Sequence, residues 1–128
     1  MTPPFTGRCL CGAVTFRGTA APLWQVHCHC ESCRRATASP FTSFFGIADG
    51  QWQWTGATPA TYASSPGTYR DFCPRCGTPM AYRADRFSGE THFYAATLDR
   101  PETYEPQAHV HTDEMLPWLH LSDGLPRK

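Results

Sequence analysis

An excess of charge of either sign is absent from this sequence of 128 residues, in which eleven basic residues balance eleven acidic ones. Nucleic acids and acidic membrane surfaces are attracted by a broad positive field, so a neutral chain is not expected to bind either of them. We therefore expect the ligand to be a small molecule, with neither nucleic acid nor membrane as a partner. The oligomeric state is left open.

Long apolar runs are absent as well. No stretch approaches the roughly 18 residues that cross a bilayer, and residues 1–5 have neither the basic segment nor the apolar core of a secretory signal. Because nothing directs the chain out of the cytoplasm, we predict a cytoplasmic protein. The length is typical of one compact domain, so we expect a single domain over 1–128 with an ordered core at about 5–124.

Helix signals are scarce, because ten glycines and twelve prolines divide the sequence into short segments. Within several segments apolar and other residues alternate, as in strands with one buried face. The one good helix candidate is a turn or two at 31–37. The predicted fold class is therefore mostly β, a small β-sheet domain with short strands and little helix. Strands are expected around Val14 and Phe16, Trp24 and Val26, and Trp52 and Trp54, and over 41–47, 68–72, 80–83 and 92–95.

Seven cysteines are the strongest functional signal in the sequence. An odd number cannot pair completely within one chain, and a cytoplasmic chain keeps its thiols reduced, so metal binding is favoured over disulfides. Two of the clusters are pairs, Cys9 with Cys11 and Cys73 with Cys76, each followed directly by glycine. Glycine permits a tight turn with positive φ, which lets backbone N–H groups point at the thiolates.

The two pairs together make a complete tetrahedral set of four thiolates, which leaves a zinc ion no open position. We therefore predict one structural zinc ion that ties the N-terminal strand to the hairpin at 73–76 and contributes folding energy. A single Cys-x-x-Cys pair could instead serve redox chemistry. That chemistry requires a βαβ setting, of which the sequence gives no sign.

The remaining cysteines, Cys28, Cys30 and Cys33, form the third cluster. In an extended segment Cys28 and Cys30 point to the same face, and a short helix that follows can bring Cys33 back to meet them. Three protein ligands with an open fourth position are typical of a catalytic zinc ion. We thus expect two zinc ions, the second of them labile. His27 and His29 should face away, although either one as a fourth ligand would make this site structural too.

Charge limits the chemistry of this second site. Three thiolates give Zn²⁺ a net charge of about −1, so hydrolysis by zinc hydroxide is disfavoured, whereas an incoming thiol can be held as a nucleophile beside an aldehyde. Arg34 and Arg35 could offset the thiolate charge or hold a substrate carboxylate, or they could be solvated surface residues. Spacing does not single out a general base among Asp71, Asp113, Glu31, His29 and His111.

Three blocks of the sequence carry a family resemblance: Gly-Arg-Cys9-Leu-Cys11-Gly-Ala-Val, Cys28-His-Cys30-Glu-Ser-Cys33-Arg-Arg and Phe-Cys73-Pro-Arg-Cys76-Gly-Thr-Pro. The chain resembles the glutathione-dependent formaldehyde-activating enzyme (GFA) family, which also includes centromere protein V. The resemblance spans nearly the whole chain, including the segment Ala108-His109-Val110-His111. It implies a zinc-bound, mostly β fold of the Mss-four-like type.

The resemblance also implies roles for the seven cysteines and a reaction. Cys28, Cys30 and Cys33 match the ligands of the family's catalytic zinc, and its structural zinc ligands match Cys9, Cys11, Cys73 and Cys76. The founding activity joins glutathione and formaldehyde to S-hydroxymethylglutathione. We therefore expect a zinc-dependent carbon–sulfur lyase-like enzyme that acts on a small thiol adduct, with glutathione as the first candidate thiol. The alternative is a non-enzymatic zinc module for a protein partner, which needs neither an exchangeable ion nor an open ligand position.

Overall fold

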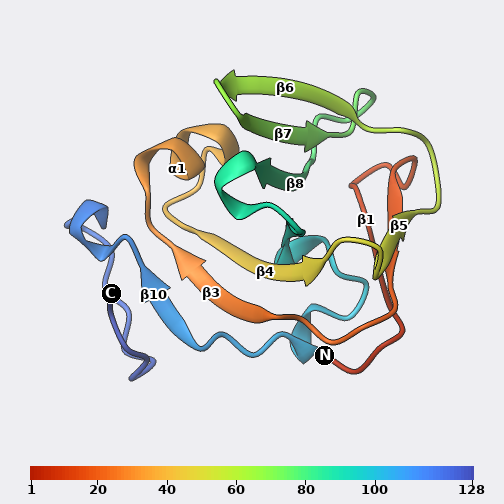
Figure 1. Ribbon diagram of the computed structural model, residues 1–128. Coiled ribbons are helices and arrows are strands. Elements are labelled where there is room, and N and C mark those ends of the chain that lie inside the picture. The colour runs from red at the N-terminus through yellow and green to blue at the C-terminus, as the bar shows by residue number, and fades with distance from the viewer.

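The computed structural model describes residues 1–128, in which the strands form two sheets (Figure 1). The three-stranded sheet has the order β1-β2-β5, and its neighbouring strands are antiparallel. The seven-stranded sheet has the order β10-β3-β4-β9-β8-β7-β6, in which only the pairing of β10 with β3 is parallel. The strands are β1 (Phe5–Arg8), β2 (Thr15–Gly18), β3 (Trp24–Cys28), β4 (Thr42–Ala48), β5 (Trp52–Trp54), β6 (Ala60–Ser65), β7 (Thr68–Phe72), β8 (Pro79–Ala84), β9 (Glu90–Tyr94) and β10 (Ala108–Val110).

The single α-helix, α1 (Glu31–Thr37), directly follows β3. Its first turn is capped by a cysteine, because the Cys30 side chain accepts a hydrogen bond from the backbone N–H of Cys33 at 3.4 Å. The helix ends at Thr37, and the capping residue Ala38 has a left-handed backbone with φ 53°. Short 3₁₀ turns complete the structure: η1 (Asp85–Phe87), η2 (Ala95–Thr97), η3 (Pro101–Thr103) and η4 (Thr112–Glu114). None of the helices is long and apolar enough to pass through a membrane.

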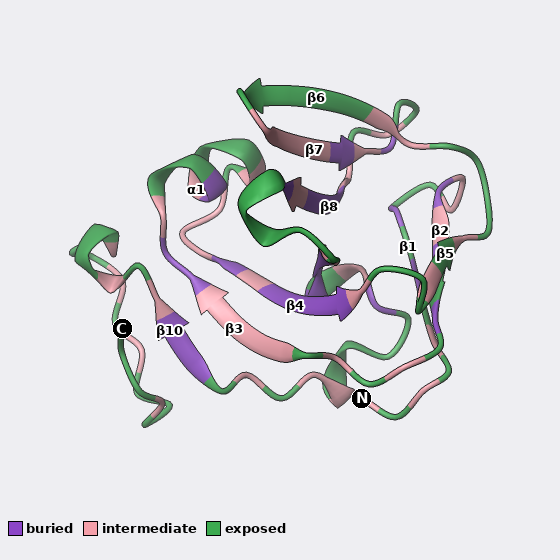
Figure 2. Ribbon diagram, in the orientation of Figure 1, coloured by how far each residue is buried: buried purple, intermediate pink, exposed green.

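Aromatic side chains fill the main core between the two sheets. Phe93 of β9 is fully buried, and its ring centroid lies 4.4 Å from that of Phe16 and 4.9 Å from that of Trp52. Phe45 of β4 stacks on the same ring at 5.7 Å. Figure 2 shows β4 largely buried, whereas β6 at the far edge of its sheet is mostly exposed. The core therefore joins the three-stranded sheet to the middle of the larger one.

The predicted fold class is confirmed, since the chain is mostly β with one short helix. The predicted helix at 31–37 and the predicted strand at 68–72 coincide with α1 and β7. Val14 is a correction, because it lies in the turn before β2 rather than in the strand, although its side chain is buried. Strands β1, β6 and β10 were not predicted. The expected single domain and the expected cytoplasmic location stay predictions.

Candidate metal centres

The first cysteine cluster joins the end of β1 to the connection between β7 and β8. The four sulfur atoms of Cys9, Cys11, Cys73 and Cys76 all lie within 4.8 Å of one another. The Cys9 and Cys11 sulfurs are 3.6 Å apart, and those of Cys11 and Cys73 are 3.8 Å apart. A tetrahedral ion with Zn–S bonds of about 2.3 Å places its sulfurs about 3.8 Å apart. The donor type, number and spacing therefore fit a zinc ion.

Backbone turns aim N–H groups at these sulfurs. The Cys9 sulfur accepts a hydrogen bond from the N–H of Val14 at 3.3 Å, and the Cys73 sulfur accepts one from Cys76 at 3.4 Å. Gly12 and Gly77, which follow the two pairs, have φ of 81° and 80°. A side chain is strained in this conformation, so glycine after each second cysteine is what the turns require. Donors of this kind spread the charge of thiolate ligands.

The second cluster lies at the junction of β3 and α1. Cys28 ends β3, Cys30 caps α1 and Cys33 lies in its first turn, and the three sulfurs are all within 4.8 Å of one another. Cys28 and Cys33 are buried, whereas Cys30 is partly exposed. The strand and helix predicted from the sequence thus bring these three thiols together. The three sulfurs lie close enough together to bind one metal ion between them.

The pKa values of Cys28 and Cys30 in the second cluster are shifted in opposite directions. Hydrogen bonds from Cys28, and then from Cys33, lower the pKa of Cys30 far below its ordinary value. The same contacts with Cys30 and Cys33, followed by burial, raise the pKa of Cys28. A thiolate is the form that binds metal, so Cys30, the partly exposed member of the cluster, is the one whose shifted pKa favours that form.

The two histidines next to Cys28 in sequence, His27 and His29, have partners other than the sulfurs. His27 Nδ1 lies 2.8 Å from the Ser43 hydroxyl, and His29 Nε2 lies 2.8 Å from Nδ1 of His109. Neither histidine belongs to the thiol cluster, so the structure gives no support to a histidine as its fourth ligand. His29 and His109 are fully buried behind the cluster, and burial lowers the pKa of His29 to about 4. His109 Nε2 in turn lies 2.8 Å from a carboxylate oxygen of Asp123.

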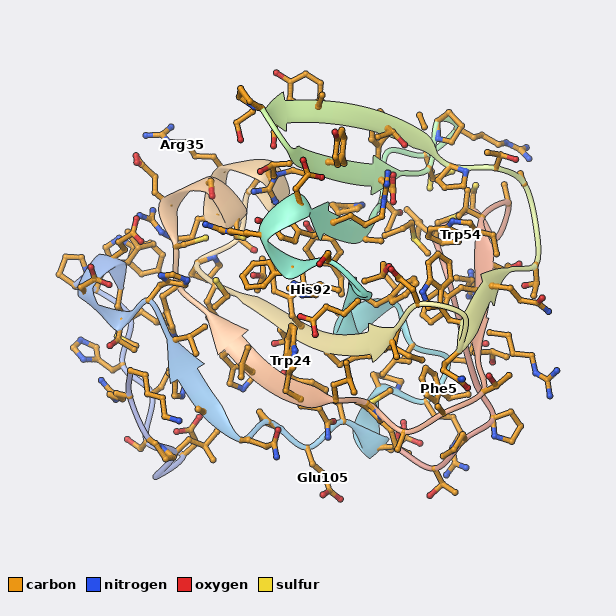
Figure 3. The ribbon with its side chains drawn as sticks, in the orientation of Figure 1. Phe5, Trp24, Arg35, Trp54, His92 and Glu105 are labelled. Carbon is orange, nitrogen blue, oxygen red and sulfur yellow. The ribbon has the colours of Figure 1, made fainter.

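A different arginine from those singled out in the sequence approaches the second cluster. Arg70 of β7 points its two terminal nitrogens at the Cys33 sulfur, at 3.9 and 4.0 Å, and lies 3.5 Å from the Tyr94 hydroxyl. Arg34 instead donates to the backbone carbonyl of His29 at 3.4 Å. Figure 3 shows Arg35 directed away from the body of the protein, where it pairs with Glu31 at 3.7 Å. Of these three arginines, Arg70 is therefore the one placed to offset negative charge on the sulfurs of the second cluster.

Three hollows meet around the second cluster. An apolar cavity of about 340 Å³ is lined by all three cysteines together with Trp24 and Phe44. A wide polar groove of about 1380 Å³ between α1 and the β6–β7 hairpin is lined by Arg35, Arg70 and Arg86. A shallow polar hollow of about 510 Å³ is lined by Cys30, Glu31, Arg35, Arg86, His111 and Glu114. All three cysteines thus border the apolar cavity, and Cys30 also borders a hollow lined by two arginines and two glutamates.

The five candidate general bases differ in whether they line the hollows next to the cysteines. His111 lines both the apolar cavity and the shallow hollow, and Glu31 lines the hollow. Asp71 is buried in a two-bonded pair with Arg83 at 2.8 Å, and His29 is held by His109. His111 also has a left-handed backbone with φ 55°, which is uncommon for a residue with a side chain. Of the five candidates, His111 alone reaches the apolar cavity beside the cysteines.

Comparisons with known proteins agree with this architecture. Residues 4–114, which include all seven cysteines, match the sequence model of the family described as glutathione-dependent formaldehyde-activating enzyme. An uncharacterized lyase of Schizosaccharomyces pombe is 32% identical over 80 residues, which make up 62% of this chain and 58% of that protein. A crystal structure of a Rhodobacter sphaeroides protein has a similar fold, with a TM-score of 0.62 over 96% of this chain and 99% of that chain, at 17% identity.

Proposed function

Because the chain belongs to the glutathione-dependent formaldehyde-activating enzyme family, we propose that it is a zinc-dependent carbon–sulfur lyase acting on the adduct of a small thiol and an aldehyde. The family and the lyase of S. pombe support a lyase in general. The observation that carries the finer proposal is that Cys28, Cys30 and Cys33 line a cavity. A structural ion needs no such access, whereas a catalytic ion does.

We assign the two thiol clusters to two zinc ions. Cys9, Cys11, Cys73 and Cys76 would hold a structural ion, and this assignment is supported by sulfur separations of 3.6 and 3.8 Å. Cys28, Cys30 and Cys33 would hold the catalytic ion. An ion held by three thiolates supplies a position for the sulfur of an incoming thiol and favours its thiolate form.

The polar groove suits a thiol that carries carboxylates, of which glutathione is the first candidate. Arg35 and Arg86 line the groove and also the shallow hollow next to Cys30. A guanidinium group binds a carboxylate through two parallel hydrogen bonds, so these two side chains can hold the thiol in one orientation. Arg70 would stay against Cys33 and offset the negative charge of the sulfurs. Two arginines therefore orient the substrate while a third balances the site.

The proposed reaction is an addition and its reversal. The thiol sulfur forms a bond to the carbonyl carbon, the carbon–oxygen double bond becomes a single bond, and the thiol proton ends on the oxygen. In the reverse direction the carbon–sulfur bond breaks and the proton returns. His111 lines both hollows beside Cys30, so its imidazole can take the proton from the thiol and deliver it to the oxygen.

Zinc content and turnover test this proposal together. We expect two zinc ions per chain, and dialysis against a mild chelator should reduce this number to one. The conversion of glutathione and formaldehyde to S-hydroxymethylglutathione should be lost at the same time. Cys33→Ser should carry one zinc, stay folded and lose turnover. The matched control is Trp118→Ala, because Trp118 is 64% exposed and lines none of the three hollows.

A cobalt-substituted protein gives an independent measurement. Cobalt in the second cluster should change its visible spectrum when glutathione is added, because an open position takes up the thiol sulfur. One zinc that never leaves, a spectrum unchanged by glutathione and no turnover of glutathione with formaldehyde by the unchanged protein would refute the enzyme and favour the alternative of a zinc module for a protein partner. Turnover retained in Cys33→Ser would refute the catalytic role of the second cluster.

A further inference from the structure

We propose that the apolar cavity next to the second cysteine cluster binds the side group of the aldehyde, so that the substrate is an uncharged aldehyde with an alkyl or aryl group rather than formaldehyde alone. This inference rests on the proposed function, since it names the substrate class of the same site. Formaldehyde has no side group and leaves such a cavity unused. The size, the walls and the position of the cavity each support a larger substrate.

The size of the cavity fits a phenyl ring or a short alkyl chain. Its volume of about 340 Å³ is roughly twice that of a cavity of about 150 Å³ that is known to hold benzene in another protein. It also lies at the lower end of the range of about 300–1,000 Å³ that is usual for ligand pockets. The cavity is therefore large enough for six to eight carbon-sized groups, on the order of a hexyl or benzyl group.

The walls of the cavity are aromatic and come from several elements. The ring of His92 on β9 lies 4.5 Å from Trp24, 5.5 Å from Tyr82 and 5.0 Å from Phe87, measured between ring centroids. Figure 3 shows Trp24 and His92 next to each other, although they belong to different strands. Phe44 of β4 adds a further buried ring. An apolar group in contact with these faces would be partly removed from water.

The polar groups of the aromatic walls are already partnered within the protein, whereas Arg86 and His111 also line the shallow hollow next to Cys30. Glu90 accepts hydrogen bonds through one carboxylate oxygen from the Trp24 indole N–H at 3.3 Å and from His92 Nε2 at 2.7 Å. Arg86 donates to the Tyr82 hydroxyl at 3.1 Å. A charged or strongly polar ligand group would lose water without gaining equivalent partners, which is unfavourable. The part of the cavity between the aromatic walls therefore selects an uncharged side group.

The position of the cavity fixes which part of the substrate enters it. Cys28, Cys30 and Cys33 line it, so an aldehyde whose side group fills the cavity has its carbonyl carbon close to the sulfurs. The groove adjoins this cavity, since Ser32, Tyr82 and Arg86 line both, and a carboxylate-bearing thiol can lie along its arginines. The two partners thus occupy neighbouring hollows next to the second cluster.

The first test measures binding without catalysis. Ethanol, butanol, hexanol and benzyl alcohol are titrated into the zinc-loaded protein, and the NMR signal of the Trp24 indole N–H is followed. Affinity should rise roughly fourfold for each added methylene, which corresponds to about 0.8 kcal/mol per buried methylene. An affinity for hexanol within twofold of that for ethanol overturns the inference.

The second test uses variants. Val110→Phe fills the cavity from β10, and Phe87→Ala removes a wall that is 38% exposed, so at least the second should fold. Each should lower hexanol affinity and the ratio of kcat/KM for hexanal to that for formaldehyde, by about tenfold for Val110→Phe. The control is Leu23→Phe, because Leu23 is 55% exposed and does not line the cavity, and it should change hexanol affinity less than twofold.

The outcomes separate the two proposals. If formaldehyde adducts turn over but the alcohol series is flat, the apolar substrate class is wrong and the lyase stands. If the alcohol series is graded and both variants reduce it, but no aldehyde turns over with any thiol, the lyase fails and the cavity binds an apolar ligand for another purpose. A graded series together with faster turnover of hexanal than of formaldehyde supports both.

Discussion

Removal of the Arg70 guanidinium should weaken zinc binding at the second cluster and leave the first unaffected. Its terminal nitrogens lie 3.9 and 4.0 Å from the Cys33 sulfur, which becomes a thiolate when an ion binds. Two unit charges at 4 Å interact by about 4 kcal/mol at an effective dielectric constant of 20. Arg70 is only half-buried, so interaction with water would replace part of this Coulomb energy when the guanidinium is removed. The net contribution is therefore nearer to that of a hydrogen bond to a charged group, about 1.5–3 kcal/mol.

This magnitude predicts that Arg70→Met binds the second zinc roughly 10- to 100-fold more weakly than the unchanged protein. The assay is competition for zinc with a coloured chelator, in which the two ions leave in separate phases. The tightly held zinc of the first cluster is an internal reference within the same molecule. Arg70→Lys keeps the positive charge but loses the forked arrangement of N–H donors. Its affinity for the second zinc should therefore lie between those of Arg70→Met and the unchanged protein.

The matched control is Arg17→Met, because Arg17 is an exposed arginine of β2 in the other sheet. It should leave both zinc affinities unchanged. If Arg70→Met holds its second zinc within threefold of the unchanged protein, Arg70 does not stabilise the thiolates and the electrostatic reasoning is refuted. An equal loss in Arg17→Met would point to general instability instead.

Three further changes test the fold. Cys73→Ser should remove the structural zinc and with it the fixed near-UV circular dichroism, because zinc binding is worth about 10–16 kcal/mol in small zinc domains; an unchanged spectrum contradicts a structural role. Phe93→Ala should lower the free energy of unfolding in urea by about 3–5 kcal/mol, since the side chain is fully buried, and a loss below about 1 kcal/mol would mean that the core closes around the gap. Asp71→Ala should cost about 1–2 kcal/mol in the same assay, because Arg83 and Thr61 lose their acceptor while water reaches the partly exposed Arg83, and an equal loss in Asp71→Asn would show that the charge is immaterial.

Sequence patterns within a few residues predicted the helix and several strands. Glycine and proline limit where a helix can lie, and the predicted 31–37 coincides with α1. The alternation of apolar residues located β3 and β5. Strand β6 was missed because five of its six residues are exposed and give no alternation. Strand β10 was missed because it has three residues and is held by a parallel pairing with β3, a contact distant in sequence.

The candidate site was predictable to the extent that its ligands are local. Sulfur spacing grouped the cysteines as the structure does, because a strand followed by a helix brings Cys28, Cys30 and Cys33 together within six residues. Arg70 is 37 residues from Cys33 and reaches it only through strand pairing, so no spacing rule could find it. The apolar cavity also depends on pairing, because its walls come from strands and turns spread over the chain.

The buried contact between His29 and His109 sets an order of events during synthesis. The two residues are 80 positions apart, so at about 5–20 residues per second a ribosome makes His109 about 4–16 s after His29. During this interval the three cysteines around His29 have neither their supporting histidine nor the parallel strand β10 behind them. The second cluster is thus made early and completed late, and its thiols depend on the reducing capacity of their surroundings until the last strand arrives.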